Sequence, residues 1–304
     1  MFYNEVMRAE YREEECQSAL NRVRGMPFAW SLNPYTGCAH RCTFCYVRAF
    51  ELRADRPADD RYGRSIRVKV NVAEVLAREL ERPSWSREQV SIGAATDPYQ
   101  PAEGRYRLTR SCIEVLAQAR SPFGLITRGP LIVRDVDVLQ EASRRTDVSV
   151  MFSVPTLDPD VWRTTEPGTA PPRQRLRALS ALVDAGIKAS VGMAPILPGL
   201  SDRPEQLAEV VKAVRAAGAT SVWANLLYLK PGTKEHFLEA LARDWPEQLE
   251  RYEQLYASHA YLPRAQVDPV RNEVRALARE HGVRDRREQP LKPPPEPVQL
   301  TLAL

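Results

Sequence analysis

The chain of 304 residues predicts an α/β fold with a parallel sheet, because short apolar runs alternate with segments of helical periodicity. The predicted strands cover residues 28–33, 90–96, 123–127, 148–154, 188–196 and 221–229. Strands that alternate with helices of 10–15 residues are typical of βαβ units, in which neighbouring strands lie parallel. Six such units can form either an open doubly wound sheet or an incomplete (β/α) barrel.

Four segments between the strands have apolar residues at helical spacing, and they cover residues 108–120, 133–145, 172–186 and 204–218. Gly186 and Gly218 stand at the ends of the last two, where glycine commonly follows a helix. Residues 245–282 predict a helical extension after the last strand. Residues 284–304 are rich in proline and predict a flexible tail, so we expect residues 1–283 to form the folded unit.

Composition favours a protein with a large hydrophobic core that works in the cytoplasm. Hydrophobic residues make up 43% of the chain, yet no apolar run reaches the roughly 18 residues of a membrane-spanning helix. The N-terminus is charged and lacks the apolar stretch of a secretion signal. Five cysteines without the pattern of a disulfide framework also suit a reducing compartment. We therefore expect a cytoplasmic protein with no membrane contact.

The net charge of +4 does not by itself indicate a nucleic-acid-binding protein. Arginines nevertheless gather in residues 53–69 and 171–177, where their planar guanidinium groups could bind phosphates or carboxylates. A solvated, arginine-rich surface explains the same clusters more simply. Nucleic acid therefore stays open as a partner.

Long polar loops follow all six predicted strands at their C-terminal ends, the edge at which parallel α/β folds place their functional residues. The loops lie within residues 33–48, 96–104, 127–131, 153–160, 194–202 and 229–237. Turn formation explains each loop singly, but it explains less readily why all of them are long and polar. We expect the functional site at this edge of the sheet.

Three cysteines, Cys38, Cys42 and Cys45, fall within eight residues of the first of these loops. Thiolates bind zinc, copper(I) or iron–sulfur clusters. Zinc is an alternative here because His40 could complete a Cys₃His set. However, structural zinc sites normally take their ligands from two separate parts of the chain, whereas these four residues crowd one short loop.

The number of cysteines also argues against an ordinary ferredoxin cluster, which needs four thiolates. The two remaining cysteines, Cys16 and Cys112, have no suitable spacing, and Cys112 lies in an apolar helical stripe where a buried core thiol is expected. Three thiolates on a [4Fe–4S] cluster would leave one iron open to coordinate a small molecule. Zinc and such an open cluster are the two interpretations that the cysteines allow.

The spacing C-x₃-C-x₂-C, with the aromatic Phe44 before the last cysteine, resembles the signature of the radical S-adenosylmethionine (SAM) superfamily. The resemblance implies a partial (β/α)6 barrel of the TIM type, in which Cys38, Cys42 and Cys45 hold a [4Fe–4S] cluster whose open iron binds SAM. An electron from a reductant such as flavodoxin or ferredoxin then cleaves SAM to methionine and a 5′-deoxyadenosyl radical. That radical removes hydrogen from a substrate.

Longer stretches narrow the resemblance to the spore photoproduct lyase-related, DNA-repair-photolyase-like group. These stretches are residues 33–48, 96–110, 126–139 and 194–202. The similarity runs from about Ser18 to about Tyr261 and is strongest to an uncharacterised bacterial subgroup. It implies an enzyme that modifies a substrate by radical chemistry, with nucleic acid as one candidate substrate.

The resemblance also implies which residues contact SAM, namely Thr96, Asp97, Arg128, Ser153, Ala194 and Ile196. Thr96 and Arg128 would lie near the methionine carboxylate of SAM, where a guanidinium can form two parallel hydrogen bonds. Ser153 would bind the ribose region, and Ala194 and Ile196 would contact the adenine.

The hydroxyl and carboxyl groups of this set each have a simpler alternative role. Thr96 and Ser153 could bond to their own backbone at a strand end. Asp97 could serve the turn before Pro98, or it could bind SAM or substrate.

Two positions depart from the lyase group. That group returns hydrogen through a cysteine near the end of the second strand and through tyrosines beside the last cluster cysteine. In this chain Ala94 and Phe44 replace the cysteine and the first tyrosine, and neither has an S–H or O–H to transfer. Tyr46 remains as the candidate catalytic residue, so we expect a reaction other than the known thymine-dimer reversal.

The last six residues, Gln299–Leu304 (QLTLAL), resemble the short peptide by which bacterial repair proteins bind the sliding clamp. An extended peptide can place alternate side chains in pockets, although chance or packing on the barrel explains so short a motif too. A non-catalytic zinc- or cluster-containing nucleic-acid-binding module is the alternative function. Radical modification of a protein or tRNA is a further enzymatic hypothesis.

Overall fold

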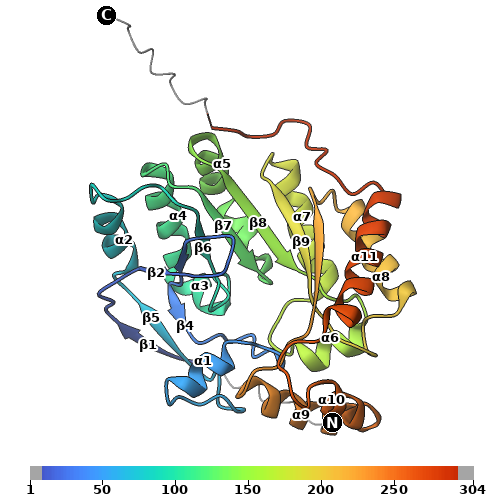
Figure 1. Cartoon of the computed structure of the whole chain (residues 1–304). Helices are drawn as coiled ribbons and strands as arrows, with labels where there is room; N and C mark the ends of the chain where they lie inside the picture. The colour runs from blue at the N-terminus through green and yellow to red at the C-terminus, as the bar shows by residue number, and fades with distance from the viewer. Residues whose placement is uncertain (1–8, 294–304) are drawn as a thin grey trace, which may run out of the picture.

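Seven strands form the larger sheet of the computed structural model, which describes residues 9–293 (Figure 1). Their order is β10-β9-β8-β7-β6-β3-β2. The bounds are Leu20–Arg22 for β2, Trp30–Leu32 for β3, Val90–Ile92 for β6, Phe123–Thr127 for β7, Val148–Ser153 for β8, Ala189–Ile196 for β9 and Val222–Leu226 for β10. Strands β3 and β6 to β10 pair in parallel, and β2 pairs antiparallel with β3.

This topology confirms the predicted α/β class and the partial barrel. All six predicted strands are present, and β7 has the predicted bounds. The sheet does not close, because β2 and β10 are edge strands of it. Consecutive helices pack on each other in chain order, as α2 does on α4 and α4 on α5, which is the arrangement of the outer layer of a barrel.

Four of the outer helices begin and end close to the predicted positions, a fifth lies within the predicted extension at 245–282, and the helix at Val72–Leu80 was not predicted. The outer helices are α2 (Val72–Leu80), α4 (Leu108–Gln118), α5 (Val136–Arg145), α7 (Pro172–Asp184), α8 (Pro204–Ala216) and α11 (Arg264–Glu280). Proline opens α7 and α8, where its missing N–H costs no helical hydrogen bond. The predicted helix at 133–145 divides in two, since residues Pro130–Asp135 form a 3-10 turn before α5.

Shorter helices lie mostly at the cysteine end of the sheet, and sequence periodicity did not reveal α1, α3, α6 or α9. They are α1 (Arg48–Arg53), α3 (Pro101–Tyr106), α6 (Pro159–Thr165), α9 (Thr233–Asp244) and α10 (Leu249–Leu255), with a 3-10 turn at Pro246–Gln248. Helices of six or seven residues, such as α1, α3 and α6, span too few turns for a clear apolar period. Helix α9 has 12 residues, and its start lies in the predicted loop at 229–237.

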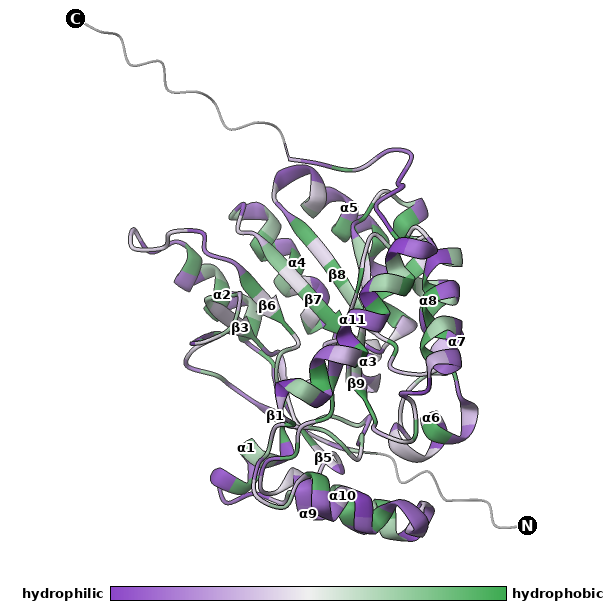
Figure 2. Cartoon of the chain, turned by 45° about the vertical axis from the view of Figure 1, so that its right-hand side comes forward, coloured by the Kyte–Doolittle hydropathy of each residue, from purple (hydrophilic) through white to green (hydrophobic). Residues whose placement is uncertain are grey.

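The main hydrophobic core lies between the sheet and the outer helices. Figure 2 shows hydrophobic residues along β7, β8 and β9 and on part of the surface of α4 and α8. Phe152 and Val191 of the sheet and Ile113 of α4 are completely buried. Cys112 is completely buried in the same core, as its place in the apolar stripe predicted. Cutting any of these large side chains to alanine removes about 2–5 kcal/mol of stability.

A small second sheet, which the sequence analysis did not foresee, holds the start of the cysteine-containing loop. It consists of β1 (Glu10–Glu14), β5 (Ser65–Lys69) and β4 (Tyr35–Thr36), in the order β1-β5-β4. Tyr35 pairs with Val68 and Thr36 with Arg67. The backbone two residues before the first cysteine is therefore fixed by a strand that follows it by some thirty residues.

The first part of the predicted tail contacts the barrel. Arg287 Nη1 donates to the carbonyl of Gly186 at 2.8 Å, and the Leu291 N–H bonds to the same oxygen at 3.2 Å. The Gln299–Leu304 peptide lies outside the described residues, so its clamp role stays a prediction. Within residues 9–293, no helix combines the length and the apolar character needed to cross a membrane.

Candidate functional site

The cysteine loop, residues 33–47, connects β3 to α1 at the C-terminal edge of the sheet (Figure 1). All three cysteines are unpaired thiols; Cys38 is 8% exposed, Cys42 is 6% exposed and Cys45 is half-buried. The Cys45 side chain packs against the residues around Cys38 and against those around Cys42. Its sulfur lies 3.7 Å from the Tyr62 hydroxyl oxygen. The fold therefore gathers the three predicted metal ligands in one partly enclosed place.

Two side chains that follow β6 hold the backbone of the cysteine loop. The Thr96 hydroxyl donates to the carbonyl of Gly37 at 2.7 Å, and Gln100 Nε2 donates to the same oxygen at 3.1 Å. Gln100 Oε1 accepts from the Ala39 N–H at 2.9 Å. Thr96, predicted from the resemblance to contact SAM, thus has a positioning role immediately before Cys38.

A second brace comes from the end of α6 and the turn after it. The Thr43 N–H bonds to the carbonyl of Thr165 at 2.9 Å, and the Gly168 N–H bonds to the carbonyl of His40 at 3.0 Å. A Cβ atom on Gly168 would collide with the Ala39 carbonyl, so only glycine allows this approach. The two contacts fix the loop on either side of Cys42.

Asp97 ties the cysteine loop to the end of β7. Its carboxylate accepts hydrogen bonds from the Thr127 hydroxyl and the Arg128 N–H, both at 2.6 Å, and from the Tyr99 N–H at 2.9 Å. His40 Nδ1 lies 3.3 Å from the same carboxylate. Burial alone would raise the pKa of Asp97, but His40 and the hydrogen bonds from Thr127 and the Arg128 N–H lower it to about 2.

The donor set consists of three thiols in one loop, and thiolates are the ligand type of iron–sulfur clusters as well as of zinc. No three His, Cys, Asp or Glu side chains among residues 9–293 are arranged to hold one ion, as a tetrahedral zinc site requires. His40, the fourth ligand of the zinc alternative, faces Asp97 instead. Thiolates that bind different irons of one cluster do not have to converge on a point.

Burial keeps the metal-free thiols of Cys38 and Cys42 protonated at neutral pH. It raises the pKa of Cys38 well above its usual value, and it raises the pKa of Cys42 to about 12, an effect that Arg128 opposes and Glu166 adds to. Metal binding to thiolates would therefore release protons here.

Arg128 follows β7, where it forms a buried ion pair with Glu166 and contacts the cysteine loop at Phe44. Its Nε donates to Glu166 at 2.9 Å, and Arg175 Nη1 lies 2.7 Å from the same carboxylate oxygen. Arg128 Nη2 also donates to the carbonyl of Ala194 at 3.3 Å, and its guanidinium lies 5.6 Å from the ring centre of Phe44. Burial lowers the pKa of Arg128, but Cys42, Glu166 and Asp97 more than offset this, so it stays charged.

This network leaves both donors and an acceptor unmatched. Glu166 is completely buried, and its second oxygen, Oε1, has no hydrogen-bond partner within the described part of the chain. Arg128 carries five N–H groups, and two of them have the partners given above. A buried polar atom without a partner costs free energy. Among the described residues, Glu166 Oε1 is therefore an unpartnered buried acceptor, and it lies beside Arg128, whose side chain is 19% exposed.

Sequence reasoning found Arg128 but missed Glu166 and Arg175. Both lie outside the strand-end loops where we expected the site, Glu166 as the C-cap of α6 and Arg175 in α7. No sequence signal separates them from exposed charges, since their burial follows from how α6 and α7 pack.

The remaining SAM-contacting candidates lie at neighbouring strand ends. Ser153 ends β8; its carbonyl accepts from Arg175 Nη1 at 2.9 Å, and its hydroxyl has no recorded partner among residues 9–293. Ala194 is half-buried near the end of β9, and Ile196, the last residue of β9, is completely buried. Arg175 and Arg128 thus connect Ser153 and Ala194 to the cysteine loop through Glu166.

Tyr46, the candidate catalytic residue, lies at the rim of the site and is 36% exposed. Its hydroxyl donates to the carbonyl of Ala94, and its ring lies 6.1 Å from that of Tyr228. Burial of the hydroxyl raises its pKa, so the phenol keeps its hydrogen at neutral pH. Tyr46 thereby joins the cysteine loop to the residues that follow β6 and β10.

Comparison with known sequences agrees with this geometry. A sequence model of the radical SAM superfamily matches residues 32–211. An uncharacterised protein of Mycobacterium tuberculosis is 40% identical over 270 residues, which cover 88% of this chain and 79% of the relative. A radical SAM Nalpha-GlyT isomerase of Pseudomonas phage M6 is 23% identical, over 81% of this chain and 50% of the phage protein.

Among solved structures, the fold is similar to that of spore photoproduct lyase. A complex of that lyase with dinucleoside spore photoproduct superposes with a TM-score of 0.69 at 14% sequence identity. The superposition covers 89% of this chain and 79% of the lyase chain. A mutant lyase with bound AdoMet and the same dinucleoside gives a TM-score of 0.68 at 16% identity. At these identities the likeness describes the fold alone.

Proposed function

The chain belongs to the radical SAM superfamily, and on that premise we propose that Cys38, Cys42 and Cys45 hold a [4Fe–4S] cluster. It is an enzyme of SAM-dependent radical chemistry. The observation that carries the proposal is the gathering of three unpaired thiols in one braced loop, without the arrangement that a single ion requires. The non-catalytic zinc module that the cysteines also allowed has no such support.

The bound cofactors supply the chemistry, and the chain supplies binding and orientation. When bound and reduced, the cluster supplies the electron that cleaves SAM, which then provides the radical that removes hydrogen from the substrate. Enzymes of this kind need an external reductant, for which flavodoxin or ferredoxin is our proposal.

Arg128 and Glu166 hold the amino-acid part of SAM in this proposal. The free N–H groups of Arg128 bind its carboxylate, and Glu166 Oε1 accepts from its amino group. Arg175 and the Ala194 carbonyl keep these two side chains in place, as their hydrogen bonds support. Ser153 binds the ribose with its free hydroxyl.

Asp97 and Thr96 act as positioning residues in our account, because their polar atoms are already bonded to the cysteine loop and the strand ends. Ala194 and Ile196 form the apolar side of the adenine site. Ile196 is completely buried, and its carbonyl accepts from the Leu227 N–H at 3.0 Å.

The substrate that we propose is nucleic acid, handled by a reaction different from that of the lyase with the similar fold. A solved structure of that lyase contains a dinucleoside, and this supports a nucleotide-sized substrate. Ala94 and Phe44 lack a transferable hydrogen. Tyr46 is a nearby side chain that can donate one, from a hydroxyl that contacts Ala94.

Anaerobic reconstitution with iron and sulfide tests the metal assignment. We expect about four iron and four acid-labile sulfide per chain, and loss of both in a Cys38→Ala, Cys42→Ala, Cys45→Ala variant. Cys16→Ser is the matched control, since Cys16 is a half-buried thiol outside the loop. Zinc without labile sulfide in the wild-type protein would contradict the proposal.

A further inference from the structure

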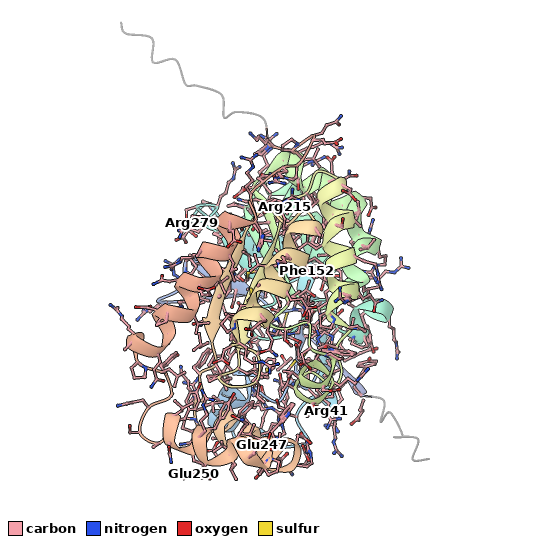
Figure 3. The ribbon with its side chains drawn as sticks, turned by 90° about the vertical axis from the view of Figure 1, so that its right-hand side faces the viewer. Arg41, Phe152, Arg215, Glu247, Glu250 and Arg279 are labelled. Atoms are coloured by element: carbon pink, nitrogen blue, oxygen red, sulfur yellow. The ribbon has the colours of Figure 1, made fainter. Side chains whose placement is uncertain are left out.

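A second pocket opens beside the cysteine loop, and none of the residues proposed to hold SAM lines it. Its volume is about 460 Å³, which is within the range of small-molecule sites. Four arginines from separate parts of the chain line it: Arg41 of the cysteine loop, Arg48 of α1, Arg163 of α6 and Arg243 of α9. Figure 3 shows Arg41 at the lower end of the molecule, away from Arg215 and Arg279.

Two of these guanidinium groups have buried donors without partners. Arg48 is 1% exposed; its Nη1 donates to the carbonyls of Ala58 and Asp59, but its Nε has no partner among the described residues. Arg41 Nη2 donates to the carbonyl of Asp60 at 3.2 Å, and its Nε is likewise buried and unpartnered. Buried N–H groups are nearly always hydrogen-bonded in folded proteins. The two unpartnered Nε–H groups therefore point to a hydrogen-bond acceptor from outside the described chain.

The charge on the pocket wall also favours an anion. Arg243 pairs with Asp244 at 2.6 Å and Arg163 with Asp160 at 3.3 Å, whereas Arg41 and Arg48 bond to neutral carbonyls. The two inner arginines therefore have no carboxylate partner in an ion pair among the described residues, although the ring centre of Tyr62 lies 4.7 Å from the Arg48 guanidinium. Solvent does not reach Arg48 to screen its charge.

The positive charge of Arg48 also acts on His236 of α9, another residue that lines the pocket. Burial first, and then the positive charge of Arg48, lower its pKa to about 4. The imidazole is therefore neutral at pH 7, where it offers a hydrogen-bond donor and acceptor without adding charge.

The number and spread of the donors select the kind of anion. A carboxylate is satisfied by one planar guanidinium, whereas a phosphate presents three or more oxygens in different directions. Arginines that approach from four elements suit the phosphate. The acidic side chains of Asp60 and Glu239 also line the pocket, and they can accept hydrogen bonds from sugar hydroxyls. The lining residues include no Phe, Tyr or Trp, so the imidazole of His236 is the one aromatic ring among them.

We propose that this pocket binds a sugar phosphate, with the phosphate on Arg41 and Arg48 and the sugar hydroxyls facing Asp60 and Glu239. The sugar phosphate is either a free ester or one nucleotide unit of a polynucleotide. Binding here involves neither SAM nor the cluster, so the proposal stands or falls separately from the assignment of the three cysteines.

The test is calorimetric titration of the anaerobically purified, reconstituted protein with inorganic phosphate, ribose 5-phosphate and a short single-stranded RNA. Arg163→Gln should weaken binding of ribose 5-phosphate about two- to fivefold, because an exposed charge–charge contact contributes about 0.4–1 kcal/mol. Glu239→Gln removes a negative charge and should strengthen binding of inorganic phosphate by a similar factor. Arg279→Gln, on α11 at the other end of the molecule, is the matched control and should change neither.

The three probes also separate the two sources of the phosphate. Tighter binding of ribose 5-phosphate than of RNA indicates a free ester, and the reverse order indicates a polynucleotide. Either result supports the proposed binding site if Arg163→Gln weakens the binding of the preferred probe. The His236 imidazole signals in the NMR spectrum should shift with the same saturation curve. No saturable binding of any probe at millimolar concentration, or affinities that Arg163→Gln and Glu239→Gln leave unchanged, would overturn the proposal.

Discussion

Two groups of arginines lie near the cysteine loop, and they differ in their hydrogen-bond partners. Those around Arg128 are paired with a buried carboxylate, whereas Arg48 and Arg41 bond to neutral carbonyls. Near Arg128, the guanidinium groups of Arg128 and Arg175 share the completely buried carboxylate of Glu166. In the pocket beside Arg48, Arg41 and Arg48 face no such carboxylate, and Arg163 and Arg243 are largely exposed. Removing one partner of the first, buried arrangement should lower the stability of the fold considerably. The second arrangement leaves guanidinium groups available to an exchangeable ligand.

The largest expected effect comes from breaking the buried network. Glu166→Ala leaves two buried guanidinium groups without their carboxylate, so it should lower the free energy of unfolding by about 3–5 kcal/mol. Chemical denaturation of the metal-free protein measures this. Glu239→Ala, an acidic residue exposed in the pocket, is the matched control and should change stability by less than about 0.5 kcal/mol. Equal losses in the two variants would remove the contrast between the regions.

A pH titration of stability should reveal the Asp97 contacts. The pKa of this carboxyl is lowered in the folded protein from 3.8 to about 2, so its stabilisation is complete above about pH 4 and is lost as the pH falls toward 2. The contribution is about 2 kcal/mol. The unfolding free energy of the wild type, measured between pH 6 and 2, should therefore fall more steeply than that of Asp97→Asn. Parallel curves would show that His40 and Thr127 do not act on this carboxylate.

A smaller effect should follow from removing the loop brace at Thr96. Thr96→Val deletes a donor to the Gly37 carbonyl and an acceptor for Gln100, which should cost about 1–2 kcal/mol. It should also lower the iron content after reconstitution, because the backbone before Cys38 is less firmly held. Thr164→Val is the control, since that hydroxyl bonds only within α6. Full iron content in Thr96→Val would argue against the positioning role.

The smallest effect is expected in the pocket. Arg243→Gln breaks an ion pair with a neighbouring residue on the surface, so the unfolding midpoint should hardly move, by less than about 0.5 kcal/mol. A loss comparable to that of Glu166→Ala would show that the pocket arginines are structural rather than free for a ligand.

The sequence predicted those parts of the fold that repeat. Strands β6 to β10 and helices α4, α7 and α8 are long enough, or apolar enough, for their period to show. The small sheet escaped prediction, because β4 has two residues and its partner β5 lies about thirty residues further along the chain. A pairing of this kind depends on tertiary contacts rather than on local pattern.

For the site, spacing identified the three cysteines but not what surrounds them. The hydroxyl of Thr96 was expected near SAM, and the structure bonds it to the loop backbone instead of leaving it free. The sequence does not distinguish three buried charged residues, Glu166, Arg175 and Arg48, from ordinary surface charges. Only the packing of α6, α7 and α1 buries them. Apolar periodicity reports which face of an element is buried, but it does not report which charged groups that burial brings together.

The central claim is that the three cysteines of one loop support cleavage of SAM. The most direct measurement is formation of 5′-deoxyadenosine and methionine by the anaerobically reconstituted protein with dithionite, alongside Cys42→Ser and Cys16→Ser. We expect cleavage by the wild type and by Cys16→Ser, with none above background by Cys42→Ser. Undiminished cleavage by Cys42→Ser would contradict this claim, as would a wild-type protein that carries iron and labile sulfide yet leaves SAM intact.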